Sequence, residues 1–97
     1  MKYAIILSPE AIDDLRRLKA PVRSQVKEAL ETHLSHEPLK ESKSRTKRLR
    51  GVRRPGYRLR IGEIRVFYDV SEDTVEVLAL VPKSKANEWL ERVGATQ

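Results

Sequence analysis

The sequence predicts an α+β protein, a twisted antiparallel sheet with an N-terminal helical hairpin and a C-terminal helix, in the order β-α-α-β-β-β-β-α. Apolar residues recur at helical spacing over residues 9–34, alternate by twos over residues 57–70, and return to helical spacing over residues 83–93. Each change of period indicates a change of secondary structure. Because the chain has 97 residues and shows no linker or internal repeat, we expect residues 1–97 to form one domain.

The first third of the chain predicts a strand followed by two helices. Tyr3 to Leu7 is a short apolar run of the kind found in strands. Ser8 supplies an N-cap side chain and Pro9 suits the first helical position, which predicts a helix over residues 9–19. An Ala-Pro pair interrupts the helical period, which resumes over residues 22–34. The two helices therefore form a hairpin joined by a tight break.

A hairpin of strands is predicted around Gly62-Glu63, because a two-residue loop with glycine first is typical of a type II′ turn. The register that follows pairs Ile61 with Ile64, Leu59 with Val66 and Tyr57 with Tyr68 on one face, and Arg60 with Arg65 and Arg58 with Phe67 on the other. The first face is apolar, so we expect it to lie in the hydrophobic core. A short strand is expected to begin near Thr46 and another to cover residues 75–81. The last helix carries one apolar stripe, made of Ala86, Trp89, Leu90 and Val93.

The chain is strongly basic, with a net charge of +6 and an isoelectric point near 9.9. Such a chain is drawn to polyanions or to an acidic protein partner. Much of the charge lies in residues 40–54, which we expect to form a mobile basic loop. The absence of cysteine excludes disulfides, thiolate nucleophiles and cysteine-ligated zinc. The first apolar run is too short for a signal peptide or a membrane span, so we expect a cytoplasmic protein without membrane contact.

The polar face of the strand hairpin is the most informative feature. Arg60 lies directly opposite Arg65 in the predicted register, and like charges at such a pair are destabilising. A bound phosphate would reverse the sign of that cost, since a guanidinium suits phosphate oxygens, and Phe67 offers a stacking surface for an unpaired base. This face is therefore a candidate nucleic-acid site. The competing interpretation is that these arginines are ordinary surface residues and that Phe67 packs under a helix beside Leu78 and Leu80.

The two histidines do not indicate a metal site. His33 falls on the apolar stripe of the second helix, which favours packing in the core, and His36 follows in an expected loop. No cysteine or carboxylate cluster accompanies them. The sequence also lacks a Gly-rich phosphate loop and a nucleophile elbow, so we expect no metal and no cofactor.

Several motifs resemble toxins of the RelE/ParE superfamily, and RelE-type toxins in particular. They are Leu49-Arg50-Gly51, Tyr57-Arg58-Leu59-Arg60, the strand Arg65-Val66-Phe67-Tyr68-Asp69-Val70, and the strand Val77 to Val81 with a basic helix start behind it. The resemblance covers nearly the whole chain. It implies the toxin of a type II toxin-antitoxin module, with a cognate antitoxin as partner. It further implies a metal-independent endoribonuclease that enters the A site of the 70S ribosome and cuts mRNA there.

The implied reaction uses a ribose 2′-hydroxyl as nucleophile on the adjacent phosphate and leaves a 2′,3′-cyclic phosphate and a 5′-hydroxyl. It requires positive charge near the developing oxyanion and groups that transfer protons. By resemblance, Arg65 stabilises the phosphate, while Arg58 and Arg60 position the substrate and neutralise charge. The RNA-binding residues would then be Lys47, Arg48, Arg50, Arg53, Arg54, Phe67 and Trp89.

The last helix departs from the family pattern. RelE-type toxins commonly place an arginine or a His-Arg pair at its start and a tyrosine in its first turns. Here the first counterpart is Lys83, Ser84 or Lys85, and the second is Trp89 or Leu90. An indole cannot exchange a proton as a phenol does. Lys83 and Lys85 are therefore the candidate acids, and the general base is unassigned.

Two other functions stay open at this point. ParE-type toxins share the fold but inhibit DNA gyrase without cutting RNA, and a catalytically inactive member would only bind its antitoxin. The basic sheet face favours the nuclease, whereas the altered last helix leaves room for the other two.

Overall fold

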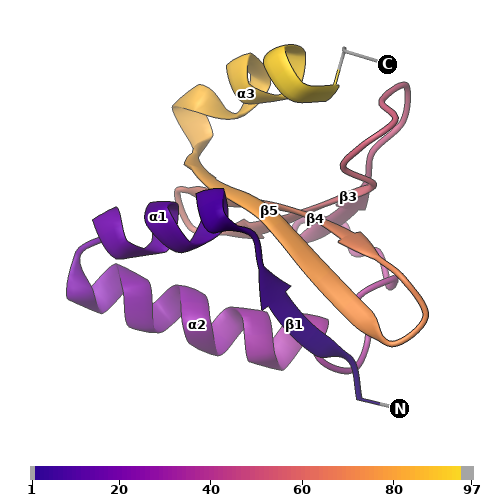
Figure 1. Cartoon of the computed structure of the whole chain (residues 1–97), viewed down its shortest axis with the longest axis horizontal. Coiled ribbons are helices and arrows are strands. Elements are labelled where there is room, and N and C mark those ends of the chain that lie inside the picture. Colours follow the sequence, from indigo (N-terminus) through magenta and orange to yellow (C-terminus); the bar gives the residue numbers. More distant parts are fainter. Residues whose placement is uncertain (1, 95–97) are drawn as a thin grey trace.

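The computed structural model describes residues 2–94 and confirms the predicted order of elements (Figure 1). Strand β1 (Ala4–Leu7) leads into helices α1 (Pro9–Arg17) and α2 (Ala20–Leu34). Strands β2 (Thr46–Arg48), β3 (Tyr57–Ile61), β4 (Ile64–Val70) and β5 (Thr74–Pro82) follow, and the 3-10 turn η1 (Lys83–Lys85) precedes helix α3 (Ala86–Gly94). The five strands form one sheet in the order β1-β5-β4-β3-β2. No helix within residues 2–94 combines the length and apolar character needed to cross a membrane.

One strand pairing differs from the predicted antiparallel sheet. β1 lies parallel to β5, with Ala4 opposite Thr74 and Leu7 opposite Val77, whereas the other three pairs are antiparallel. The connection explains the difference. Two helices and three strands separate β1 from β5, so no tight turn forces the chain to reverse direction between them.

The local signals for the helical hairpin and for the strand hairpin are confirmed. Ser8 is the N-cap of α1, and its hydroxyl accepts a hydrogen bond from the Ala11 N–H at 3.1 Å. Gly62 has a φ of 56°, and no described residue other than glycine has a positive φ. Glu63 therefore keeps a negative φ, which gives the pair the signs of a type II′ turn. β3 and β4 pair in the register predicted from that turn.

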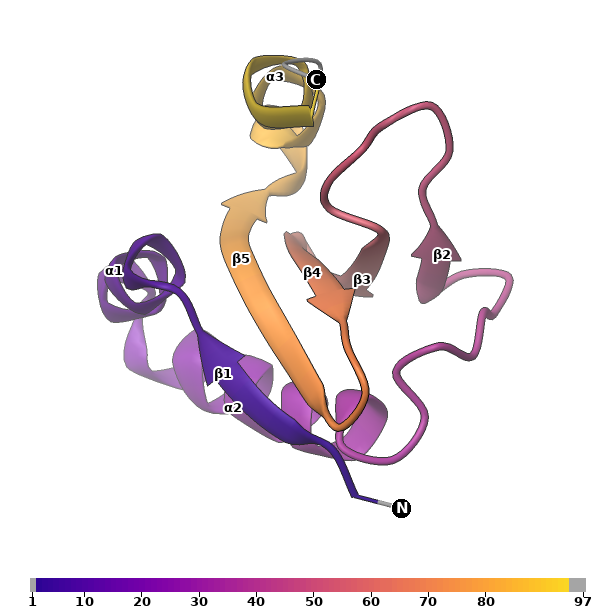
Figure 2. The same cartoon turned by 45° about the vertical axis from the view of Figure 1, so that its right-hand side comes forward.

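The core is divided between the two faces of the sheet (Figures 1 and 2). Helices α1 and α2 cover one face, where the larger cluster buries Leu34, Leu59, Val66, Tyr68 and Val77 with several others. Helix α3 covers part of the opposite face, where a smaller cluster holds Phe67, Ala79, Val81 and Trp89. The predicted stripe of α3 packs in this second cluster, so that prediction is confirmed.

A β-bulge at Leu78 exchanges the two sheet faces for the residues of β5 that follow it. Tyr68 pairs with Val77 and Phe67 pairs with Ala79, so Leu78 is the extra residue. The helix α1 satisfies the backbone there: the Ser8 hydroxyl donates to the Leu78 carbonyl at 2.9 Å, and the Leu80 N–H donates to the Asp14 carboxylate at 3.0 Å. Beyond the bulge, Ala79 faces α3 and Leu80 faces the helical hairpin.

Candidate nucleic-acid interface

The sheet register gathers four cations on the face that α3 partly covers. Lys47 pairs with Arg58, which pairs with Phe67, so these side chains form one row across β2, β3 and β4. Arg60 and Arg65 form the next row toward the β3–β4 turn. We call Arg58, Arg60 and Arg65 the arginine triad. The sequence prediction of three guanidinium groups on one face is confirmed.

Arg58 is the least satisfied member of the triad. Its side chain is half-buried, and its Nε is buried without a hydrogen-bond partner among the described residues. Burial lowers the pKa of the Arg58 guanidinium, and the positive charges of Arg65 and Arg60 lower it further. An unpartnered buried donor and two like charges both cost free energy, and an anion bound at the guanidinium offsets the repulsion between the like charges.

Arg65 is held by the turn beside it. Only 7% of the residue is exposed, and its Nη1 donates to the Gly62 carbonyl at 2.8 Å and to the Ile64 carbonyl at 3.2 Å. These bonds fix the guanidinium and use part of its donor capacity. Arg65 therefore supplies positive charge from a fixed position, while the Arg58 guanidinium forms no hydrogen bond with the described residues.

The two lysines predicted as acids lie on η1, which contacts the β3–β4 turn. The Lys83 N–H donates to the Glu63 carbonyl at 2.7 Å, which places the start of η1 against the β3–β4 turn. Arg65 is bonded to the same turn through Gly62. Lys85 lies in the same η1 turn and is exposed, as is Lys83. The structure thus places η1 at the end of the sheet where Arg65 lies.

Phe67 and Trp89 are brought together, but as packing partners. Their rings stack with centroids 4.7 Å apart and an interplanar angle of 9°, and they are 0% and 5% exposed. The Trp89 Nε1–H also donates to the Glu10 carboxylate at 2.9 Å. In this arrangement neither ring has a free face for a base. Phe67 does pack under a helix beside Leu78, as the competing interpretation held, whereas Leu80 lies on the other side of the sheet.

The residues predicted to bind RNA from the basic segment do not form one surface. Arg48 pairs with Tyr57 on the opposite face from Lys47, and its guanidinium lies 5.7 Å from the Tyr57 ring centroid. Arg54 is bound to Asp69 at 2.7 Å and to Glu76 at 2.9 Å, so its charge is already neutralised. Arg50 and Arg53 are exposed, and neither forms an ion pair within residues 2–94.

The segment between β2 and β3 is tied to the sheet rather than free. Besides the Arg54 ion pairs, the Leu49 N–H donates to the Gly56 carbonyl at 2.8 Å, and the Gly56 N–H donates to the Asp69 carboxylate. Pro55 is fully buried. The expectation of a mobile loop missed these contacts, because they join residues far apart in the sequence.

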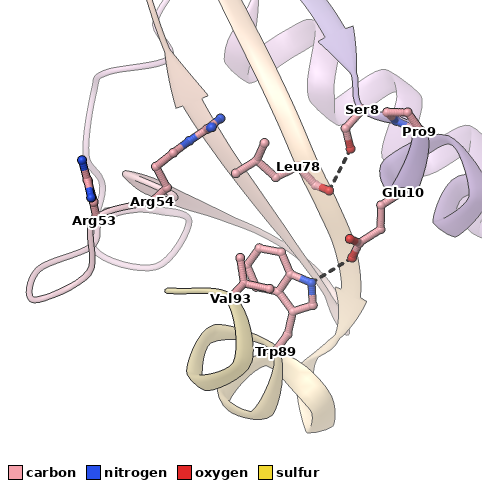
Figure 3. Close-up of a pocket in the computed structure, with 8 residues that line it drawn as sticks. All are labelled: Ser8, Pro9, Glu10, Arg53, Arg54, Leu78, Trp89 and Val93. Carbon is pink, nitrogen blue, oxygen red and sulfur yellow. Dashed lines mark hydrogen bonds between the residues drawn. The ribbon is translucent and has the colours of Figure 1, made fainter. Parts of the chain in front are cut away.

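A cavity of about 580 Å³ lies between this segment, the start of α1 and helix α3 (Figure 3). Leu78, Trp89 and Val93 line it, with Ser8 and Glu10 on one side and Arg53 and Arg54 on the other. No member of the arginine triad lines it. The cavity and the triad are therefore separate features of the same sheet face.

These features define a class of protein: small basic α+β proteins with the fold of RelE-type toxins. Solved structures of such toxins match this chain. The toxin-antitoxin complex RelBE2 from Mycobacterium tuberculosis matches with a TM-score of 0.68 and 26% identity, over 84% of this chain and 99% of that one. A mutant of E. coli toxin RelE in the free state gives 0.71 and 23%, over 96% and 99%. The YoeB dimer from Staphylococcus aureus gives 0.61 and 19%, over 81% and 94%.

A family model described as ParE toxin of type II toxin-antitoxin system, parDE, matches residues 5–87. The chain therefore belongs to this toxin family and, with it, to the RelE/ParE superfamily. No curated protein matched the chain in a sequence comparison. The predicted superfamily and the RelE-like fold are both confirmed.

Proposed function

We propose that this toxin is a ribosome-dependent mRNA endoribonuclease that arrests translation. The observation that carries the proposal is Arg58, whose buried Nε has no partner among the described residues and whose charge is crowded by Arg60 and Arg65. The like charges around the Arg58 guanidinium cost free energy, and a bound anion offsets that cost. The anion we propose is the scissile phosphate of mRNA.

In the proposed reaction the ribose 2′-oxygen attacks the adjacent phosphorus, the bond to the 5′-oxygen breaks, and the products are a 2′,3′-cyclic phosphate and a 5′-hydroxyl. Arg58 donates to a non-bridging oxygen, and Arg65 adds fixed positive charge as negative charge develops there. Arg60 and Lys47 hold the neighbouring backbone. Lys83 or Lys85 protonates the leaving oxygen, which leaves the 2′ proton to a group of the ribosome or to water.

Dependence on the ribosome follows from the composition of this face. Arginines and lysines supply charge but little proton transfer, so the rate depends on how well the substrate is aligned. Phe67 and Trp89 are packed against each other and add no free stacking surface. The A site of the 70S ribosome is the proposed source of that alignment.

The proposed partners also include a cognate antitoxin. M. tuberculosis RelBE2 is described as a toxin-antitoxin complex and the Methanococcus jannaschii relative as a RelB-RelE antitoxin-toxin complex. A net charge of +6 favours an acidic partner of this kind. We propose that residues 1–97 act as one toxin domain in the cytoplasm, without a metal or another cofactor.

A second candidate function is inhibition of DNA gyrase without cleavage of RNA. The observation that favours it is the family model itself, which is the ParE model and matches residues 5–87. The absence of the usual tyrosine, whose counterpart here is Trp89 or Leu90, also weakens the nuclease pattern.

One experiment separates the two. Wild type, Arg58→Ala and the control Arg16→Ala, an exposed arginine of α1, are induced in cells, and mRNA 5′ ends are mapped during growth arrest. The nuclease predicts cleavage at codon-phased positions in wild type and Arg16→Ala, and a loss of at least about 100-fold in Arg58→Ala, the usual effect of removing one oxyanion donor. Arrest with intact mRNA and DNA damage signalling would instead identify gyrase as the target.

A further inference from the structure

A polar groove lies where β2 begins and the edge of β3 is left open. β2 starts opposite Leu59, so from Arg60 onward β3 has no neighbouring strand on that side. The chain ahead of β2 crosses there, with the Arg60 N–H donating to the Arg45 carbonyl at 2.8 Å. The groove, about 340 Å³ in volume, runs between this crossing and α2, and Thr32, His33, Arg45 and Arg60 are among the residues that line it. An adjoining hollow of about 240 Å³ shares Thr32, His33 and Arg45.

Two groups of this groove, the Arg45 guanidinium and the His33 ring, lack partners in the described part of the chain. Neither the Arg45 guanidinium nor the His33 ring has a hydrogen bond or an ion pair with residues 2–94. Arg60 reaches only the Ser44 carbonyl, at 3.5 Å. All three residues line the groove.

The carboxylates that face this space are Glu28 and Glu37. Glu37 lies 3.9 Å from Lys40, so each offsets the other's charge. Glu28 lines the groove without an ion pair within residues 2–94. The remaining balance is two arginines against one glutamate, which leaves the groove positive.

The environment of His33 agrees with an excess of positive charge in the groove. The sequence favoured packing in the core, but the residue is half-buried at the groove and lies in neither core cluster. Burial lowers the pKa of the His33 ring below 6.5, and the charge of Arg45 lowers it further. Two groups that can carry positive charge thus line the same space, and neither forms an ion pair with a carboxylate of residues 2–94.

We propose that this groove is a second phosphate subsite for RNA, in which Arg45 and His33 bind a backbone phosphate next to the one held at the arginine triad. The inference rests on the proposed function, since it takes RNA as the ligand. Arg60 connects the two sites, because it lines the groove and also lies opposite Arg65. An RNA chain that leaves the triad across Arg60 meets Arg45 next. The planar fork of Arg45 binds phosphate oxygens, and His33 becomes a second charged donor once it is protonated.

The first test reads the site directly with inorganic phosphate. NMR titration of the two histidines with and without phosphate is expected to show the His33 pKa rising when phosphate binds, because an anion favours the imidazolium. His36, which is exposed and lines neither hollow, is the internal control. In Arg45→Ala the His33 pKa should rise without phosphate, since a positive neighbour is gone, and phosphate should then add little. A His33 pKa that ignores phosphate in the wild-type protein overturns the proposal.

The second test uses a short single-stranded RNA and its salt dependence. Arg45→Ala should weaken binding roughly tenfold, and it should reduce the slope of log K against log salt by about 0.7, the value for one phosphate contact on a single strand. Lys27→Ala removes an exposed charge from the same helix outside the groove and should leave that slope less affected. Glu28→Gln should tighten binding. Equal slopes in wild type and Arg45→Ala overturn the proposal.

The outcomes distinguish this inference from the proposed nuclease. RNA binding that depends on Arg45, in a protein that cuts no mRNA in cells, supports the groove and rejects the nuclease. A glutamate-rich peptide that shifts His33 while RNA does not would assign the groove to an acidic protein partner, and the RNA subsite would be rejected.

Discussion

On the α1/α2 side of the sheet the inward residues of β3, β4 and β5 are uniformly apolar, whereas on the α3 side the same strands place arginines beside a small aromatic cluster. Tyr57, Leu59 and Ile61 alternate with Arg58 and Arg60, so one strand serves both faces. The first face is closed by two helices, and the second is only partly covered by one. The larger part of the core thus lies on one side of the sheet, and the arginines on which the proposed RNA binding depends lie on the other.

Breaking the closed face should have the largest effect. Leu34 on α2 is fully buried, so Leu34→Ala should lower the free energy of unfolding by about 2–5 kcal/mol, since it removes apolar contacts and leaves a cavity. Denaturant unfolding followed by circular dichroism measures this. Leu39→Ala is the matched control, because Leu39 is 51% exposed and its truncation should change stability little. Similar losses in the two variants would contradict the division between the faces.

The contact that holds α3 should contribute less. Trp89→Phe keeps an aromatic ring against Phe67 but removes the hydrogen bond to Glu10, and we expect a loss of about 1 kcal/mol. A double-mutant cycle with Glu10→Ala measures the coupling between the two side chains. Additive losses would show that the bond contributes nothing.

On the open face, removing charge should stabilise the fold. Arg58→Met takes away a guanidinium that is crowded by Arg60 and Arg65 and an Nε that has no partner among the described residues. We expect a gain of about 0.2–1 kcal/mol, the range for relief of like charges across strands, together with weaker RNA binding. Thermal unfolding and RNA titration are compared on the same samples. A destabilised Arg58→Met protein would mean that Arg58 serves the fold rather than a ligand.

The smallest expected effect is a pH dependence at the bulge. Burial raises the pKa of the Asp14 carboxyl above 3.8, although the Leu80 N–H acts in the opposite direction. Protonation is therefore favoured by folding, so the contribution of this group to stability is full below the unfolded pKa and is lost as pH rises through the folded value. Asn at position 14 keeps an acceptor without the charge. Asp14→Asn should gain a few tenths of a kcal/mol relative to wild type between pH 3 and pH 7, and a constant difference would reject this.

The strand hairpin could be read from the sequence because its information is local. Gly62-Glu63 fixes a two-residue loop, and the loop then fixes every pair from Ile61–Ile64 to Tyr57–Tyr68. The arginine triad follows from the same register. Ser8 and Pro9 likewise mark the start of α1 within a few residues of sequence.

Most features that the sequence did not predict are contacts between residues far apart in the chain. The pairing of β1 with β5, the bond from Trp89 to Glu10 and the ion pairs of Arg54 depend on tertiary contacts. The bulge at Leu78 also defeats simple alternation, because one extra residue exchanges the faces of all residues after it. The burial of the Arg58 Nε without a partner also depends on tertiary packing, so the sequence could not predict it. The predicted register did place Arg60 and Arg65 next to Arg58.

The bond between Trp89 and Glu10 also gives α3 a place in the order of folding. It joins side chains 79 residues apart, and closing a loop of that length costs chain entropy. We therefore expect α1 and the sheet to pack first and α3 to dock on them afterwards. In such a folding order the arginine triad is assembled on β3 and β4 before the helix that packs on Phe67 is in place.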